Sequence, residues 1–231
     1  MSDALTLKQL AARIDLHLHR GDATAKDIEQ QCALAHEKKF ASVSVNSSRI
    51  VLARHFLDDT KVLVSAVVGF PLGAMEADAK RYETEAAIDA GAQEIEMVLN
   101  IGRLKDGDTK FVLREVRDVV EAADERPVKV ILETSLLSNE EKWLACELIT
   151  DTGARFVQSS TGFSSGGATI EDVRLLREAV GPKFGVKASG GIRDLKTILA
   201  LIEAGATRIG TSNVTGIVEE FGPVEVEVEK N

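Results

Sequence analysis

Short β-rich runs alternate with longer amphipathic helical patterns along the chain, and this alternation limits the fold more than any other feature. Three of the helical patterns end in Ala90-Gly91-Ala92, Thr152-Gly153-Ala154 and Ala204-Gly205-Ala206, and an apolar run follows each one directly. Glycine just after a helix supplies the left-handed cap. Strand–helix units that follow one another this closely predict a parallel sheet covered by helices.

The pattern predicts eight strands after a short helix near residues 5–12. The strand ranges are 13–19, 42–47, 62–69, 94–100, 128–134, 156–161, 185–190 and 208–212. The main helical patterns between them are 24–38, 75–90, 109–123, 139–152, 169–180 and 195–204. Eight such units in 231 residues predict a TIM (β/α)8 barrel with a short N-terminal helix. We expect a single domain over 1–231, with the barrel at about 13–220 and a polar C-terminal tail that includes the alternating segment 224–229.

The charge and cysteine content narrow the classes of function. A net charge of -9 argues against nucleic acid or an anionic membrane as a partner. We expect a cytoplasmic protein, because the first thirty residues are polar and no apolar run approaches the roughly 20 residues of a membrane span. Cys32 and Cys146 lie in helical patterns, so we expect reduced packing residues.

Polar residues recur at the positions that would point into the barrel, since side chains alternate along a strand. These residues are Asp15, His17, His19, Ser44, Asn46, Glu94, Glu96, Asn100, Lys129, Glu133, Gln158, Ser160, Lys187 and Ser189. Burial of unpaired charge is costly. The pattern therefore predicts either a functional pocket at the carboxyl ends of the strands or a neutralising polar network around a cavity.

Glycine-rich loops follow the last two predicted strands. Gly190-Gly191 comes before a helix that begins near Asp194, and strand eight ends in Gly210-Thr211-Ser212-Asn213. The ends of strands seven and eight are where TIM barrels commonly hold phosphate on backbone N–H groups. The pair of loops predicts a site for a small phosphorylated substrate, although two tight turns would give a similar pattern.

Several longer motifs resemble the deoxyribose-phosphate aldolase family over about residues 10–220. They are Val67-Val68-Gly69-Phe70-Pro71-Leu72-Gly73, Val130-Ile131-Leu132-Glu133-Thr134, Ser160-Thr161-Gly162-Phe163, Gly166-Gly167-Ala168-Thr169 and Val186-Lys187-Ala188-Ser189-Gly190-Gly191-Ile192-Arg193. The resemblance implies a lyase that cleaves 2-deoxyribose 5-phosphate to glyceraldehyde 3-phosphate and acetaldehyde, without a cofactor and as a possible homodimer.

The resemblance also implies roles for individual residues. Lys187 corresponds to the second active-site lysine, which lowers the pKa of the Schiff-base lysine and helps to relay protons. Gly190, Gly191, Ser212 and Asn213 would hold the phosphate. We expect the remaining substrate contacts to come from Asn46, Ser160, Gly162 and Ser189.

The departures from the family pattern lie in the predicted site. At the position of the Schiff-base lysine this chain has Gln158, whose amide nitrogen cannot form an imine because its lone pair is delocalised into the carbonyl. Glu96 replaces the relay aspartate, and Ser44 replaces a cysteine. The pattern Asp-x-Thr-x-Leu becomes Asp15-Leu16-His17-Leu18-His19. One engineered exchange at position 158 would not explain the other changes, so we interpret the pocket as repurposed.

Three functions remain open. In the first, the chain is a lyase in which Lys187 or Lys129 forms the Schiff base beside Asp15, with Glu96 and His17 in acid–base roles. In the second, His17 and His19 bind zinc or another divalent metal, with Glu96, Glu133 or Asp15 completing the shell. The third is a catalytically silent phosphosugar-binding homologue in which Gln158 only hydrogen-bonds the ligand.

Overall fold

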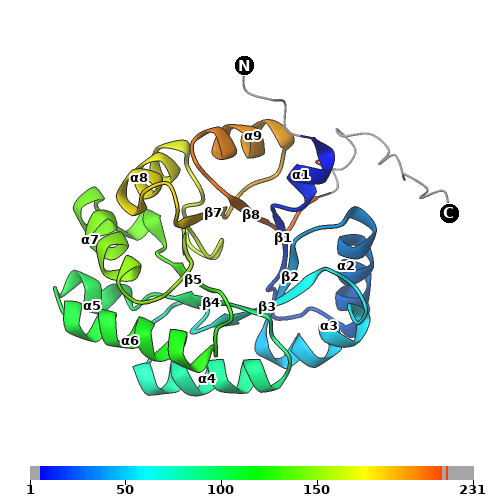
Figure 1. The fold of residues 1–231 in the computed structure, drawn as a ribbon, viewed down its shortest axis with the longest axis horizontal. Coiled ribbons are helices and arrows are strands. Elements are labelled where there is room, and N and C mark those ends of the chain that lie inside the picture. Colours follow the sequence, from blue (N-terminus) through cyan, green and yellow to red (C-terminus); the bar gives the residue numbers. More distant parts are fainter. Residues whose placement is uncertain (1–5, 215–216, 218–231) are drawn as a thin grey trace.

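A computed structural model describes residues 6–214 and 217, and it places eight parallel strands in a closed barrel (Figure 1). Each strand pairs with the next in sequence, and β8 pairs with β1. The strands are β1 Ile14–Leu18, β2 Ser42–Val45, β3 Leu63–Val68, β4 Glu94–Val98, β5 Val128–Ile131, β6 Phe156–Gln158, β7 Gly185–Ser189 and β8 Arg208–Thr211. The predicted TIM barrel is confirmed.

Helices form a ring outside the strands (Figure 1). They are α1 Leu7–Ala11, α2 Ala25–Lys38, α3 Ile50–Phe56, α4 Ala77–Asp89, α5 Ile101–Lys105, α6 Thr109–Ala122, α7 Asn139–Thr150, α8 Ile170–Val180 and α9 Leu195–Glu203. Helices α3 and α5 were missing from the predicted ranges, because 7 and 5 residues are too few to show a helical period. None of the helices within the described residues is long and apolar enough to cross a membrane.

Local signals explain where the long helices begin. Thr24 caps α2 and Ser138 caps α7, each in a capping box with the acidic residue three positions later, Asp27 or Glu141. In such a box the hydroxyl accepts from the backbone of the third helical residue while the carboxylate accepts from the cap backbone. These reciprocal bonds fix the entry of each helix onto the barrel.

The strands end earlier than the sequence pattern predicted. β2 ends at Val45, β5 at Ile131 and β6 at Gln158, where the predicted ranges ran to residues 47, 134 and 161. The polar residues that follow these strands are therefore placed by loop geometry. The predicted tail segment 224–229 lies outside the described residues.

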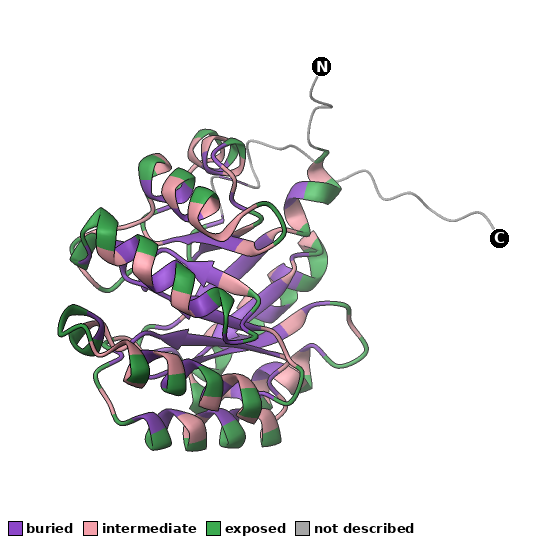
Figure 2. Cartoon of the chain, turned by 60° about the vertical axis from the view of Figure 1, so that its left-hand side comes forward, coloured by how far each residue is buried: buried purple, intermediate pink, exposed green. Residues whose placement is uncertain are grey.

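The strands are mostly buried, whereas the surrounding helices combine buried, intermediate and exposed residues (Figure 2). Between strands and helices lies an apolar core of Val, Ile, Leu and Ala side chains. Cys32 and Cys146 are free and buried, and burial raises the pKa of each thiol to about 12. Inside the ring of strands lie buried charged residues, among them Asp15, Glu94, Glu96, Lys129 and Lys187, whereas TIM-barrel interiors are usually filled by branched apolar residues.

A buried ion pair stabilises the end of β4. Lys80 Nζ lies 2.7 Å from Glu115 Oε1 and also donates to the Val98 carbonyl. Glu115 Oε2 accepts from the Asn100 backbone N–H at 3.2 Å. Asn100 was expected to point into the barrel, but its side chain instead caps α5 by accepting from Arg103. The pair thereby ties α4 and α6 to the rim of the barrel.

Candidate active site

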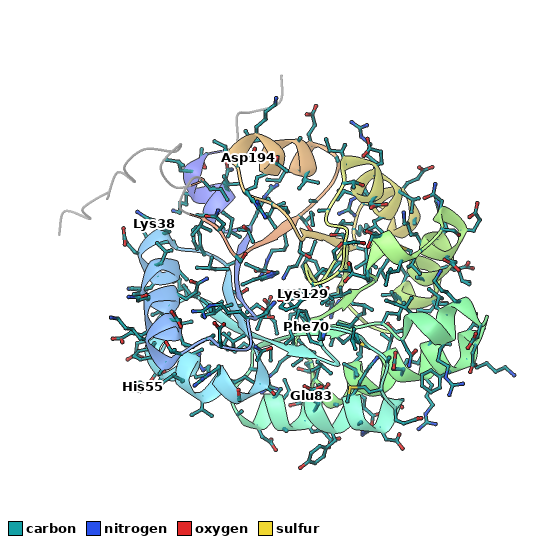
Figure 3. All side chains as sticks on the ribbon, turned by 180° about the vertical axis from the view of Figure 1, so that it is seen from behind. Lys38, His55, Phe70, Glu83, Lys129 and Asp194 are labelled. Carbon is teal, nitrogen blue, oxygen red and sulfur yellow. The ribbon has the colours of Figure 1, made fainter. Side chains whose placement is uncertain are left out.

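Lys129 lies near the middle of the ring of strands (Figure 3) and forms the centre of an ion network. Its Nζ is 2.9 Å from Asp15 Oδ2, 2.7 Å from Glu94 Oε2 and 3.6 Å from Glu96 Oε1. Arg208 completes the network from β8, where it contacts Asp15 and lies 3.0 Å from Glu94 Oε2. Burial alone would lower the pKa of Lys129, but the three carboxylates raise it above its ordinary value. Lys129 is therefore a permanently charged structural cation.

Lys187 has a different environment, although it shares the same carboxylates. Its Nζ is 2.8 Å from Asp15 Oδ2 and 2.8 Å from Glu96 Oε1. Both are ion pairs with carboxylates that Lys129 also contacts. Burial lowers the pKa of Lys187, and the charge of Lys129 lowers it further. Asp15 and Glu96 raise it, but by less than burial lowers it. Of the two buried lysines, Lys187 is the one that more readily becomes a neutral nucleophile.

The carboxylates stay ionised despite their burial. Desolvation would raise the pKa of Asp15, but Lys129, Lys187 and Arg208 hold it well below its ordinary value. The pKa of Glu96 is likewise held well below its ordinary value, because the two lysines outweigh burial. Among the described residues Glu96 Oε2 finds no hydrogen-bond donor. A buried carboxylate oxygen with no donor is a candidate acceptor for a substrate proton.

Gln158 pairs in register with Lys187 across β6 and β7. Its Nε2 donates to Ser189 Oγ at 3.0 Å, and that hydroxyl donates in turn to the Ser160 carbonyl. In the part of the chain that the structure describes, Gln158 Oε1 and Ser160 Oγ have no partner. The predicted residues Gln158, Ser160 and Ser189 are thus brought together, but much of their bonding capacity is used among themselves.

His17 and His19 stack, with ring centroids 4.7 Å apart. His19 Nε2 lies 2.9 Å from Ser44 Oγ, whereas His17 Nε2 is 3.8 Å from Glu96 Oε2. Burial, aided by Lys187, holds the pKa of His17 well below its ordinary value. Burial also lowers the pKa of His19 to about 4. Both imidazoles are therefore neutral near neutral pH.

A cavity of about 810 Å³ opens above these histidines. His17 and His19 line it on one side, and the loops after β6, β7 and β8 line the other through residues 161–167, 190–193 and 210–213. Gly162, Gly190, Gly191, Ser212 and Asn213 of the predicted substrate site all face this cavity. Lys187 and Gln158 do not line it, and both are buried.

Glycine is required where the loops after β6 and β7 meet. A side chain at Gly167 would place its Cβ 2.5 Å from the Gly190 carbonyl oxygen. The Ala168 N–H donates to that oxygen at 3.0 Å. Gly190 and Gly191 both have positive φ, 94° and 73°, which favours glycine. This backbone-lined wall, at the ends of late strands of the barrel, is suited to an anionic group.

Two predicted positions differ in the structure. Glu133 follows β5 in the left-handed region, with φ 53°, so its carboxylate leaves the inward face and accepts from the Thr161 backbone at 3.1 Å. Asn46 donates to the His19 carbonyl at 3.0 Å and does not line the cavity. Both were assigned by strand parity, which stops applying once the strand has ended.

The alternative metal set of His17, His19 and Glu133 is not assembled. Among the described residues, no group of three or more His, Cys, Asp or Glu side chains is placed to hold a metal ion. His19 is bonded to Ser44, and Glu133 is bonded to Thr161. The donor set therefore does not fit a resident metal.

Arg208 is a member of the ion network that the sequence analysis did not identify. It begins β8 and shares its parity with Gly210, so the same alternation that identified Lys187 could have identified it. Ser42, at the start of β2, was also missed, although it donates to Asp15 Oδ1 at 2.7 Å.

A model of the DeoC/LacD family of aldolases matches residues 10–218. The chain belongs to this family. Deoxyribose-phosphate aldolase from Alkaliphilus oremlandii is 53% identical over 212 residues, which are 91% of this chain and 96% of that protein. Deoxyribose-phosphate aldolase 1 from Bacillus licheniformis is 53% identical over 213 residues, 92% of this chain and 96% of that protein.

A solved structure gives the same result for the fold. Deoxyribose phosphate aldolase from Aeropyrum pernix, described as tetrameric, superposes with a TM-score of 0.87 at 31% identity. The match covers 94% of this chain and 92% of that one. The family resemblance seen in the sequence motifs is confirmed, and with it the aldolase fold.

Proposed function

We propose that this DeoC/LacD family member is a carbon–carbon lyase of the deoxyribose-phosphate aldolase type with an altered site, in which an amine other than residue 158 forms the Schiff base. The substrate is a small phosphorylated sugar or carbonyl compound. The observation that carries the proposal is the Lys187 amine, which is buried beside Gln158 and has a lowered pKa. It also lies 2.8 Å from the Glu96 carboxylate.

The reaction needs one neutral amine and one base. With 2-deoxyribose 5-phosphate, Lys187 Nζ adds to the C1 aldehyde, and loss of water gives the iminium. A base then removes the C3 hydroxyl proton, the C2–C3 bond breaks, and its electrons pass to the iminium nitrogen as an enamine. Glyceraldehyde 3-phosphate leaves. Protonation of the enamine at C2 and hydrolysis then release acetaldehyde and restore the amine.

The roles of the other charged groups follow from their bonding. Glu96 is ionised and its Oε2 has no donor among the described residues, so it can take the hydroxyl proton and return it to C2. Asp15 bridges Lys129 and Lys187 and orients the nucleophile. Lys129 cannot serve as the nucleophile while three carboxylates raise its pKa. The glycine wall at residues 190–191, with Ser212 and Asn213, would hold the phosphate.

A second candidate function is supported by a separate observation. Lys187 and Gln158 lie outside the cavity lining, and Gln158 is bonded to Ser189. A protein in this state would bind a phosphosugar without cleaving it. The two functions differ in turnover and share the phosphate site.

The test is cleavage of 2-deoxyribose 5-phosphate by the purified protein, followed through glyceraldehyde 3-phosphate. Parallel samples contain EDTA or the Lys187→Met variant. We expect EDTA-insensitive cleavage that falls by about 10²-fold or more in the variant, the scale of one positioned catalytic group. Absence of turnover, with calorimetric binding of the same sugar phosphate retained, would establish the silent binder instead. Cleavage sensitive to EDTA would contradict the amine mechanism.

We further propose a cytoplasmic homodimer. The acidic composition supports the location. The tetrameric relative from Aeropyrum pernix supports assembly in general but not this stoichiometry. Light scattering after size exclusion measures the mass of the assembly directly.

A further inference from the structure

His17 and Lys187 pack against the same glycine. A Cβ built on Gly210 would lie 2.3 Å from His17 Cε1, 2.6 Å from His17 Nε2 and 2.9 Å from Lys187 Cε. The imidazole and the lysine side chain are therefore immediate neighbours above β8. Only a residue without a side chain at position 210 leaves room for both.

The two neighbours differ in their access to the cavity. His17 lines the cavity and keeps 7% of its surface exposed, whereas Lys187 is completely buried and does not line it. Of these two neighbours, His17 is the one that contacts the cavity.

We propose that His17 is a gate over Lys187: its imidazole closes the path from the cavity to the amine, and a carbonyl group reaches Lys187 Nζ only when the ring turns aside. The consequence for catalysis rests on the proposed function, in which His17 would determine which carbonyl compounds react. The access that it controls is a property of the fold and holds with or without turnover.

The bonding of His17 suits a movable side chain. Within the described residues its Nε2 has no hydrogen-bond partner, and Glu96 Oε2 at 3.8 Å is too distant to be one. Its backbone carbonyl, by contrast, is held by Gln31 at 3.3 Å. The stacked neighbour His19 is fixed by Ser44 and by an edge contact with Phe70, so it forms a rigid wall beside the gate.

The test measures the reactivity of Lys187 without any substrate. Native protein is methylated with formaldehyde and cyanoborohydride, and labelling at Lys187 is quantified by peptide mass spectrometry relative to exposed Lys110. If the open state is populated at about 10% or less, removal of the gate raises the labelling rate by about tenfold or more. We expect this increase in both His17→Ala and His17→Thr.

Two controls separate gating from loosened structure. His17→Gln keeps a side chain of similar reach, so the rate of Lys187 labelling should stay within about threefold of wild type. Converted to free energy, a threefold change is less than half of the tenfold change expected for the small variants. His55→Ala removes an exposed histidine on the outer ring of helices (Figure 3) and should change nothing. Lys129 serves as an internal reference, because it is fully buried and held by three carboxylates.

Each result has a defined meaning. Faster labelling of Lys187 in the two small variants, with Lys129 still protected, supports the gate. Equal labelling in wild type and both small variants overturns it, and so does a parallel rise at Lys129, since access would then come from general opening. If Lys187 becomes reactive but no variant cleaves 2-deoxyribose 5-phosphate, the gate stands and the proposed lyase function fails.

Discussion

Gln158 Nε2 lies 3.0 Å from Ser189 Oγ, so the side chain that the sequence resemblance predicts to stand in place of a Schiff-base lysine is held by a neighbour on the next strand. The strand partner of Gln158 in register is Lys187, which keeps an amine in the same layer of the barrel. This pairing is the basis for proposing Lys187 as the nucleophile.

A lysine introduced at position 158 should create an efficient aldolase if the cavity accepts 2-deoxyribose 5-phosphate. In Gln158→Lys the new amine would lie beside Lys187, and two adjacent cations lower each other's pKa. We expect cleavage of 2-deoxyribose 5-phosphate to rise by about 10²-fold or more. Gln158→Met is the matched control without an amine. A lysine variant as slow as the methionine variant would mean that the cavity has been rebuilt for another ligand.

Removal of Lys129 should destabilise the barrel far more than removal of an exposed lysine. Lys129→Met leaves Asp15, Glu94 and Glu96 buried with fewer cations. Breaking a buried ion pair from one side costs about 3–5 kcal/mol. Denaturant unfolding measures this loss, with Lys110→Met as the surface control, expected within about 0.5 kcal/mol of wild type. A loss below about 1 kcal/mol in Lys129→Met would contradict the role of Lys129 as the structural centre.

The free energy of unfolding should fall as the pH drops from about 6.5 to about 4. The pKa of His19 is 6.5 in its ordinary state and about 4 in the folded protein, so the unfolded chain binds more protons in this window. Stability is therefore complete above the unfolded pKa and declines below it, by about 3 kcal/mol at most for a shift of this size.

Urea unfolding at pH 7 and pH 5 tests this dependence. His19→Leu removes the titrating group and should make the difference between the two pH values smaller. Part of the difference will remain, because the pKa of His17 is lowered in the same direction. An unchanged difference in His19→Leu would show that His19 does not contribute.

A methyl group at Gly210 should destabilise the fold and displace the His17 ring. Its Cβ would lie 2.3 Å from His17 Cε1, and overpacking of this kind costs about 1–3 kcal/mol. Gly21→Ala is the matched control, because nothing lies within 4 Å of its added Cβ and its backbone is not in the left-handed region. The thermal midpoints of Gly210→Ala and Gly21→Ala give the comparison. Equal midpoints would show that the ring moves without cost.

Much of the architecture was predictable because it depends on local patterns. The three glycine-ended helix segments and the apolar runs between them predicted eight strand–helix units, and all eight strands are present. Strand parity also identified Lys129 and Lys187 as inward-facing. Parity failed at Glu133 and Asn100, because a backbone that has left the strand no longer alternates its side chains.

The sequence by itself determined that residue 158 cannot form an imine, since the delocalised lone pair of an amide belongs to the side chain and not to its surroundings. It also determined the barrel, because local hydrophobic periodicity shows the alternation of strands and helices. Only the tertiary structure decided that Arg208 joins Asp15, that the pKa of Lys129 is raised while that of Lys187 is lowered, and that His17 and Lys187 pack against the same glycine, Gly210. These properties depend on distances between strands far apart in sequence, and closure of the barrel sets those distances.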